Sequence, residues 1–226
     1  MTVWPAIWLS VQLASLTMLI LLVIATPLAW WLTRTKNRAR PLIEALVALP
    51  LVLPPTVLGF YLLILMSPDR ILGAAWLRLT GDTLAFSFTG LLIASVIYSL
   101  PFAVQPLQTA FHAVGKGVLE ASTTLGAGPW DAFRTIVVPL SRRGFLTAMV
   151  LSFAHTLGEF GVVLMVGGNI PGKTRMISIE VFNAVETLDY ATAHRLSAGL
   201  LVFSFLVLIF VYVLNGKASG KRGGAK

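Results

Sequence analysis

The sequence predicts an all-α integral membrane protein with about five transmembrane helices. Of its 226 residues, 57% are hydrophobic and only 12% are charged, and the mean hydropathy is +0.85. Soluble domains carry roughly 25% charged residues, so a chain this apolar is typical of a membrane protein. The sequence contains no cysteine, which excludes a disulfide scaffold and thiolate metal sites.

Five apolar stretches reach the length of about 20 residues that a transmembrane helix needs. They cover residues 8–32, 42–66, 84–107, 145–166 and 193–214. The first is not expected to be a cleaved signal peptide, because its basic residues follow the apolar run. We assign residues 8–215 to one transmembrane domain. We expect residues 216–226, which are basic and rich in glycine, to form a disordered tail that contacts anionic lipid.

The distribution of basic residues predicts the orientation of the chain. Twelve of the 17 Lys and Arg residues lie within 33–41, 108–143 and 216–226. The positive-inside rule makes these segments cytoplasmic, which puts the N-terminus outside and the C-terminus inside. The net charge of +8 is therefore explained by membrane topology, and we expect membrane lipid and not nucleic acid as a partner.

Two of the expected spans contain more than one proline. The second span contains Pro50, Pro54 and Pro55, and the third contains Pro101 and Pro106. Interior proline removes backbone hydrogen bonds and kinks a helix, and the freed carbonyls must then face protein or a water-filled cavity. Kinked helices suit a solute path, although proline is also common in membrane helices generally.

The fourth span contains two ionisable residues within its apolar run. His155 and Glu159 are four residues apart, so we expect them to share one helix face, as a gate or a helix-locking hydrogen bond along a solute path. The alternative is a glutamate near the outer end that reaches water or backbone. Gly158 and Gly161 would allow close helix approach beside Glu159. No spacing in the sequence indicates a catalytic residue, a metal site or a cofactor site.

The stretch GGNIPGKT at 167–174 fits the phosphate-binding pattern G-x-x-x-x-G-K-[ST]. That pattern binds phosphate only between a strand and a helix, whereas here an expected membrane span precedes it. We therefore predict an outer-face turn. The following segment, 173–192, contains the helix-like SIEVFNAVETL and predicts an amphipathic helix on the same side.

The longest inside connection, 108–143, contains EASTTLGAGPWDAFRTIVVP at 120–139. Its Gly126–Pro129 segment predicts a turn between two short helices, the second beginning at Pro129 with Asp131 in its first turn. The small residues Ala121 and Ser122 beside Glu120 would let a partner approach closely. The alternative is an ordinary connector.

This loop resembles the one shared by permease subunits of binding-protein-dependent ABC importers, which reads Glu-Ala-Ala, then Gly, then Ile-x-Leu-Pro at fixed spacing. Ser122 and Val138 depart from it, replacing Ala and Leu. The resemblance implies a type I importer permease (MetI-like) fold in a bacterial cytoplasmic (inner) membrane, working as a homodimer. It also implies a coupling helix that enters a cleft of a separate cytoplasmic ATPase subunit, and an external oxyanion-binding protein. The residues to which the resemblance assigns this contact with the ATPase are Glu120, Ala121, Ser122, Gly126, Ile136 and Pro139.

Two further stretches resemble the sulfate and molybdate branch of that family, and in particular its molybdate importers. The family patterns are GEFG and GNIPG-x-T. The resemblance implies molybdate import, with tungstate, sulfate or thiosulfate as alternative substrates. An ATP-independent channel or secondary carrier is a further alternative, although we find no inverted repeat of the kind many carriers show. The positions that match are Gly158, Glu159, Gly161, Asn169, Pro171, Gly172 and Thr174.

Overall fold

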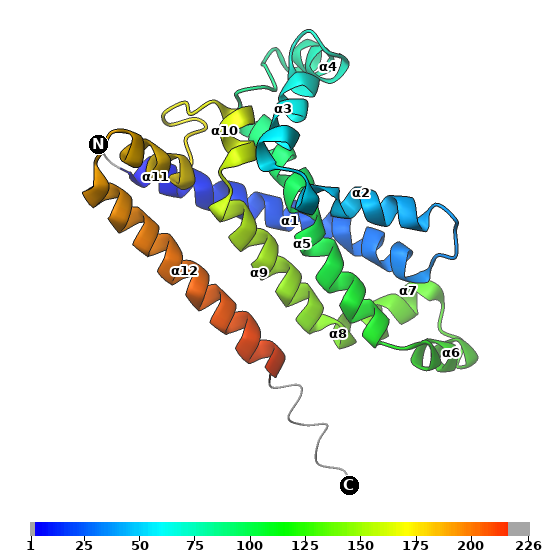
Figure 1. The fold of residues 1–226 in the computed structure, drawn as a ribbon. Coiled ribbons are helices and arrows are strands. Elements are labelled where there is room, and N and C mark those ends of the chain that lie inside the picture. The colour runs from blue at the N-terminus through cyan, green and yellow to red at the C-terminus, as the bar shows by residue number, and fades with distance from the viewer. Residues whose placement is uncertain (1–2, 217–226) are drawn as a thin grey trace.

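The computed structural model describes residues 3–216, and every regular element within them is helical (Figure 1). The predicted tail lies outside the described residues, apart from Gly216. The elements in chain order are α1 (Trp4–Arg34), α2 (Arg40–Val52), α3 (Pro55–Met66), α4 (Ile71–Thr80), α5 (Phe88–Ala113), α6 (Lys116–Thr124), α7 (Pro129–Ala132), the π-helix η1 (Phe133–Val137), α8 (Val138–Leu140), α9 (Arg142–Gly158), α10 (Gly161–Gly167), α11 (Ile177–Glu186) and α12 (Tyr190–Gly216).

Three helices among the described residues, α1, α5 and α12, are long and apolar enough to cross a membrane. The number rises to five if the bent pairs α2–α3 and α7/α8–α9 each count as one span. The all-helical fold class and its range of spans agree with the sequence prediction. The expected spans at 42–66 and 145–166 are nevertheless not continuous helices.

The second expected span breaks at two consecutive prolines. Leu53 (ψ 138°) and Pro54 (ψ 134°) are both extended, and α2 and α3 meet at 112°. A residue that precedes proline is sterically pushed out of the helical region, and here two such residues follow one another. Single prolines have a weaker effect: α5 continues as one helix through Pro101 and Pro106.

The fourth expected span breaks where no proline is present. Glu159 is extended (φ −68°, ψ 133°), so α9 ends at Gly158 and α10 begins at Gly161. His155 and Glu159 therefore do not share a helix face. The expectation that they do was wrong, because it assumed an unbroken helix.

Two hydrophobic clusters form the core, and α1 and α5 contribute to both. One cluster joins the C-terminal halves of α1 and α5 to α6, α7, η1 and α9. The other joins their N-terminal halves to α3, α10 and α11. In Figure 1 the short helices α6 and α7 lie at one end of the molecule, whereas α10, α11 and the N-terminus lie at the other. Helix α12 runs alongside α9 and is barely buried.

Candidate functional site

The 108–143 connection forms the two short helices that the sequence predicted, with the turn between them at Gly126. The amide of Gly126 donates to the carbonyl of Thr123 at 3.0 Å, and the amide of Ala127 donates to that of Ser122 at 3.0 Å. These two bonds make the helix-ending Schellman motif, which requires a left-handed residue. Gly126 has φ +85°. α7 begins at Pro129, as expected, with Asp131 in its first turn.

The motif residues of this loop fall into two groups by burial. Glu120, Ala121 and Gly126 are exposed on α6 and its turn, and Pro139 is also exposed. Ser122 is buried and its hydroxyl donates to the carbonyl of Leu119 at 2.7 Å. Ala121 and Ser122 therefore do not form one exposed flank. The exposed face is available to a partner, whereas Ser122 stabilises the helix from inside.

A cluster of aromatic rings connects the 108–143 connection to the long helices. Trp30 of α1 packs edge-on to Phe111 of α5 (5.6 Å between ring centroids) and contacts Phe133 of η1 at 5.2 Å. Phe111 also contacts Phe145 of α9 at 5.8 Å. Ile136 packs against the same core, so it anchors the loop and does not face a partner. The sequence analysis missed this cluster, because its members come from four distant segments.

Glu159 lies in the break between α9 and α10 and caps the N-terminal end of α10. It is 7% exposed, and its Oε1 accepts the amide of Val162 at 2.8 Å. The first amides of a helix have no partner within the helix, so a carboxylate here satisfies one of them and is favoured by the helix dipole. The hydroxyl of Ser178 in α11 donates to the Glu159 carbonyl at 2.5 Å. The bond from Val162 matches the alternative expected from the sequence, a glutamate that reaches neighbouring backbone, and it caps the first turn of α10.

The two broken spans meet at their breaks, with α10 packed against α3. A Cβ built on Gly161 would lie 2.6 Å from the Cβ of Pro55, so only glycine fits the present spacing. Gly158 behaves differently, because a Cβ there would have no neighbour within 4 Å. The expectation of close helix approach is thus met at Gly161 and contradicted at Gly158.

His155 is held against α5. Its Nδ1 is 2.9 Å from the hydroxyl of Ser99, which is also 2.9 Å from the hydroxyl of Thr156. The imidazole stacks on Phe102 with 3.8 Å between ring centroids. These contacts fix the imidazole between two helices.

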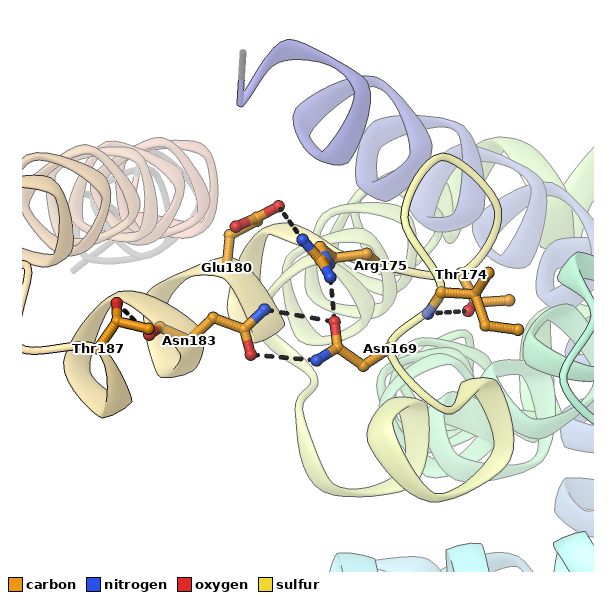
Figure 2. A network of polar contacts seen from close by, with 7 residues as sticks. Asn169, Thr174, Arg175, Glu180, Asn183 and Thr187 are labelled. Atoms are coloured by element: carbon orange, nitrogen blue, oxygen red, sulfur yellow. Dashed lines mark hydrogen bonds and ion pairs between the residues drawn. The ribbon is translucent and has the colours of Figure 1, made fainter. Parts of the chain in front are cut away.

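The loop at 167–175 is tied to α11 by a network of side chains (Figure 2). Asn169 and Asn183 exchange two amide hydrogen bonds, at 3.1 and 3.3 Å. Arg175 donates from Nε to Oδ1 of Asn169 at 2.7 Å and pairs with Glu180 at 3.5 Å. Asn169 has φ +58°, a left-handed conformation that asparagine tolerates better than most residues. The helix predicted within 173–192 is α11.

The same loop cannot cradle a phosphate in this conformation. The amides of Lys173, Thr174 and Arg175 all donate to the carbonyl of Ile170, at 3.0–3.2 Å. Thr174 is fully buried, and its hydroxyl donates to the carbonyl of Gly167 at 2.6 Å. The element before the loop is a helix, α10, and not a strand. Pro171 and Gly172 form the exposed tip. The geometry is that of a turn, as predicted.

No group of three or more His, Cys, Asp or Glu side chains within residues 3–216 is arranged to hold a metal ion.

Comparison with known proteins places this geometry in a family. The sequence profile of binding-protein-dependent transport system inner membrane components matches residues 22–219. The chain belongs to this family. It is 59% identical over 207 residues to the molybdenum transport system permease protein ModB of Azotobacter vinelandii, covering 92% of each chain. It is 37% identical over 184 residues to ModB of Escherichia coli, covering 81% of this chain and 80% of the relative.

Sulfate permeases are also related. The chain is 33% identical over 190 residues to the sulfate transport system permease protein CysT of Escherichia coli, covering 84% of this chain and 68% of the relative. Among solved structures, a bacterial alginate ABC transporter in complex with alginate pentasaccharide-bound periplasmic protein has a TM-score of 0.74 at 15% identity, covering 95% of this chain and 78% of that one. The inward-facing MetNI methionine ABC transporter has a TM-score of 0.71 at 14% identity, covering 93% of this chain and 94% of that one.

These two structures confirm the predicted fold, that of type I ABC importer permeases. The chain is an inner-membrane component of an ABC importer. Its relatives are permease subunits of transport systems, which are not themselves enzymes.

Proposed function

We propose that this chain is the permease subunit of an importer that moves molybdate across the inner membrane. The observation that carries the proposal is the 59% identity to a molybdenum permease over almost the whole chain. The exposed face of α6 and its left-handed Gly126 supply the coupling loop that such a permease needs.

We further propose how the transporter is assembled. The chain forms a homodimer, and two cytoplasmic ATPase subunits receive Glu120, Ala121 and Gly126 in their clefts. The N-terminus lies outside and the C-terminus inside, as the basic residues around α6 and after α1 require under the positive-inside rule. An external oxyanion-binding protein docks over α11 and the exposed loop tip at Pro171 and Gly172. ATP is hydrolysed in the ATPase subunits, and this chain performs no chemistry.

The contact between the two helix breaks is the proposed moving part. Coupling energy passes from α6 through the ring cluster at Trp30 and Phe133 into α1 and α5, and it shifts α3 against α10 at the Pro55–Gly161 contact. Glu159 keeps the end of α10 intact during this movement. Since a carboxylate repels a dianion, Glu159 does not bind the substrate.

The second candidate substrate is sulfate, which the relation to CysT favours. Tungstate is a third, because it matches molybdate in charge and nearly in size. Both are distinguished from molybdate by competition.

Uptake of labelled molybdate tests the proposal. In cells lacking this chain, restoring it should restore uptake, and excess sulfate should leave that uptake intact. A parallel arm with excess tungstate measures how well the system separates the two ions. Sulfate accumulation without molybdate uptake would reassign the chain to sulfate import.

A further inference from the structure

A cavity of about 800 Å³ lies beneath the coupling loop, between the end of α1 and α6. Its wall is formed by the C-terminal end of α1, the connection to α2, the end of α5, and helices α6 and α7. Its lining combines apolar and charged residues: Trp30 and Phe111 supply aromatic rings, whereas Arg34, Lys36, Arg40 and Lys116 supply positive charge.

The charge of the lining is strongly unbalanced. Four cationic side chains face the cavity, and Glu120 is the one acid among its lining residues. Arg40 forms an ion pair with Glu44, with 3.0 Å between Nε and Oε1. Within the part of the chain that the structure describes, Lys36 and Lys116 have no ion-pair partner. An anion entering the cavity would therefore meet cations that no protein carboxylate has neutralised.

One cation is already held in place. The guanidinium of Arg34 lies 4.3 Å from the centre of the Trp30 ring, a cation–π contact that fixes its position. Trp30 is fixed in turn by its edge-on contact with Phe111. An anion bound here would not have to order Arg34 first, which lowers the entropic cost of binding.

The position of the cavity indicates where the anion comes from. It lies at the end of α1, where an apolar run gives way to Thr33 and Arg34. Trp30 and Trp31 precede this point, and tryptophan is enriched at membrane–water interfaces. A lining that combines aromatic rings with cationic residues fits an amphiphile. Its phosphate would lie among the cations and its glycerol end over the rings. Basic pockets between membrane helices are suited to acidic head groups.

We propose that this cavity binds the phosphate head group of an anionic phospholipid from the adjacent leaflet. The bound lipid joins α6, through Lys116, to the end of α1, through Arg34 and Lys36. It thereby fills the space beneath the loop that the ATPase is proposed to contact. The proposal itself concerns binding and does not depend on which ion is transported.

Native mass spectrometry of the full-length permease, purified in detergent, tests this binding. The probes are phosphatidylglycerol, phosphatidylcholine and inorganic phosphate. We expect one phosphatidylglycerol to be retained preferentially over phosphatidylcholine. Each neutralised cation near an acidic head group weakens binding roughly fivefold, so the double variant Lys36→Gln/Lys116→Gln should bind phosphatidylglycerol on the order of 30-fold more weakly. The variant Glu120→Gln, which removes the one acid, should bind it about fivefold more tightly.

The matched control removes two exposed cations from the opposite end of the molecule. Arg70→Gln/Arg78→Gln changes the net charge by the same amount but should leave lipid retention unchanged, because both residues lie at α4. Equal loss in the control would overturn the proposal, as would equal retention of both lipids. Displacement of the lipid by millimolar inorganic phosphate would assign the cavity to a free anion and likewise overturn the lipid site.

Discussion

The contact between the two helix breaks makes a sharp prediction for Gly161→Ala. The new Cβ would lie 2.6 Å from the Cβ of Pro55, about 1 Å short of the 3.5–4.0 Å at which carbon atoms pack well. The proline ring cannot rotate away, so α3 must shift as a body. Overpacking of this kind costs about 1–3 kcal/mol. For a chain of this length, that lowers the thermal midpoint by roughly 2–12 °C.

Gly158→Ala is the matched control for this experiment. It makes the same chemical change three residues earlier, where a Cβ meets no atom within 4 Å. Thermal unfolding of both purified variants in detergent and molybdate uptake by both in cells are the assays. We expect Gly161→Ala to lose stability and uptake and Gly158→Ala to keep both. Equal behaviour of the two variants would refute the close contact of the breaks.

Three further substitutions test other parts of the account. Glu159→Ala leaves the buried amide of Val162 without an acceptor and should cost about 1–3 kcal/mol of stability. Glu159→Gln keeps an acceptor and should cost less. A larger loss of stability for Glu159→Gln would contradict the capping role. Asn169→Gly keeps the left-handed backbone but removes the side-chain link to α11, so limited proteolysis should cut the 167–175 loop faster than in wild type. Unchanged cleavage would count against the link. Gly126→Ala strains a residue at φ +85° by about 1–2 kcal/mol and should weaken co-purification of the ATPase subunit. Gly117→Ala, near the start of α6 where a Cβ would meet no atom within 4 Å, should not weaken it, and an equal effect of both variants would contradict the role of the turn.

Features determined by local sequence were predictable. The apolar runs located α1, α5 and α12, because a bilayer imposes length and hydropathy on each span separately. The two short helices of the 108–143 connection followed from Gly126 and Pro129, which act through their own backbone preferences. The bend between α2 and α3 was foreseen only as a kink, since the effect of two successive prolines is larger than that of one.

Features that depend on distant contacts were not predictable. The segment around Glu159 has no helix-breaking proline, and Gly161 at its break packs against Pro55, about a hundred residues earlier in the chain. The link between Asn169 and Asn183 and the ring cluster at Trp30 arise in the same way, from residues brought together by the fold. Nothing in the local pattern of either segment identifies its partner.

The most direct test of the central claim is transport by purified components. The permease would be reconstituted into lipid vesicles with its ATPase subunit, the binding protein and labelled molybdate. The account predicts molybdate transport that requires ATP on the side of the coupling loop and disappears when the ATPase subunit is omitted. Molybdate movement that continues without ATP or without the ATPase subunit would contradict it, because the chain would then be a channel or a secondary carrier.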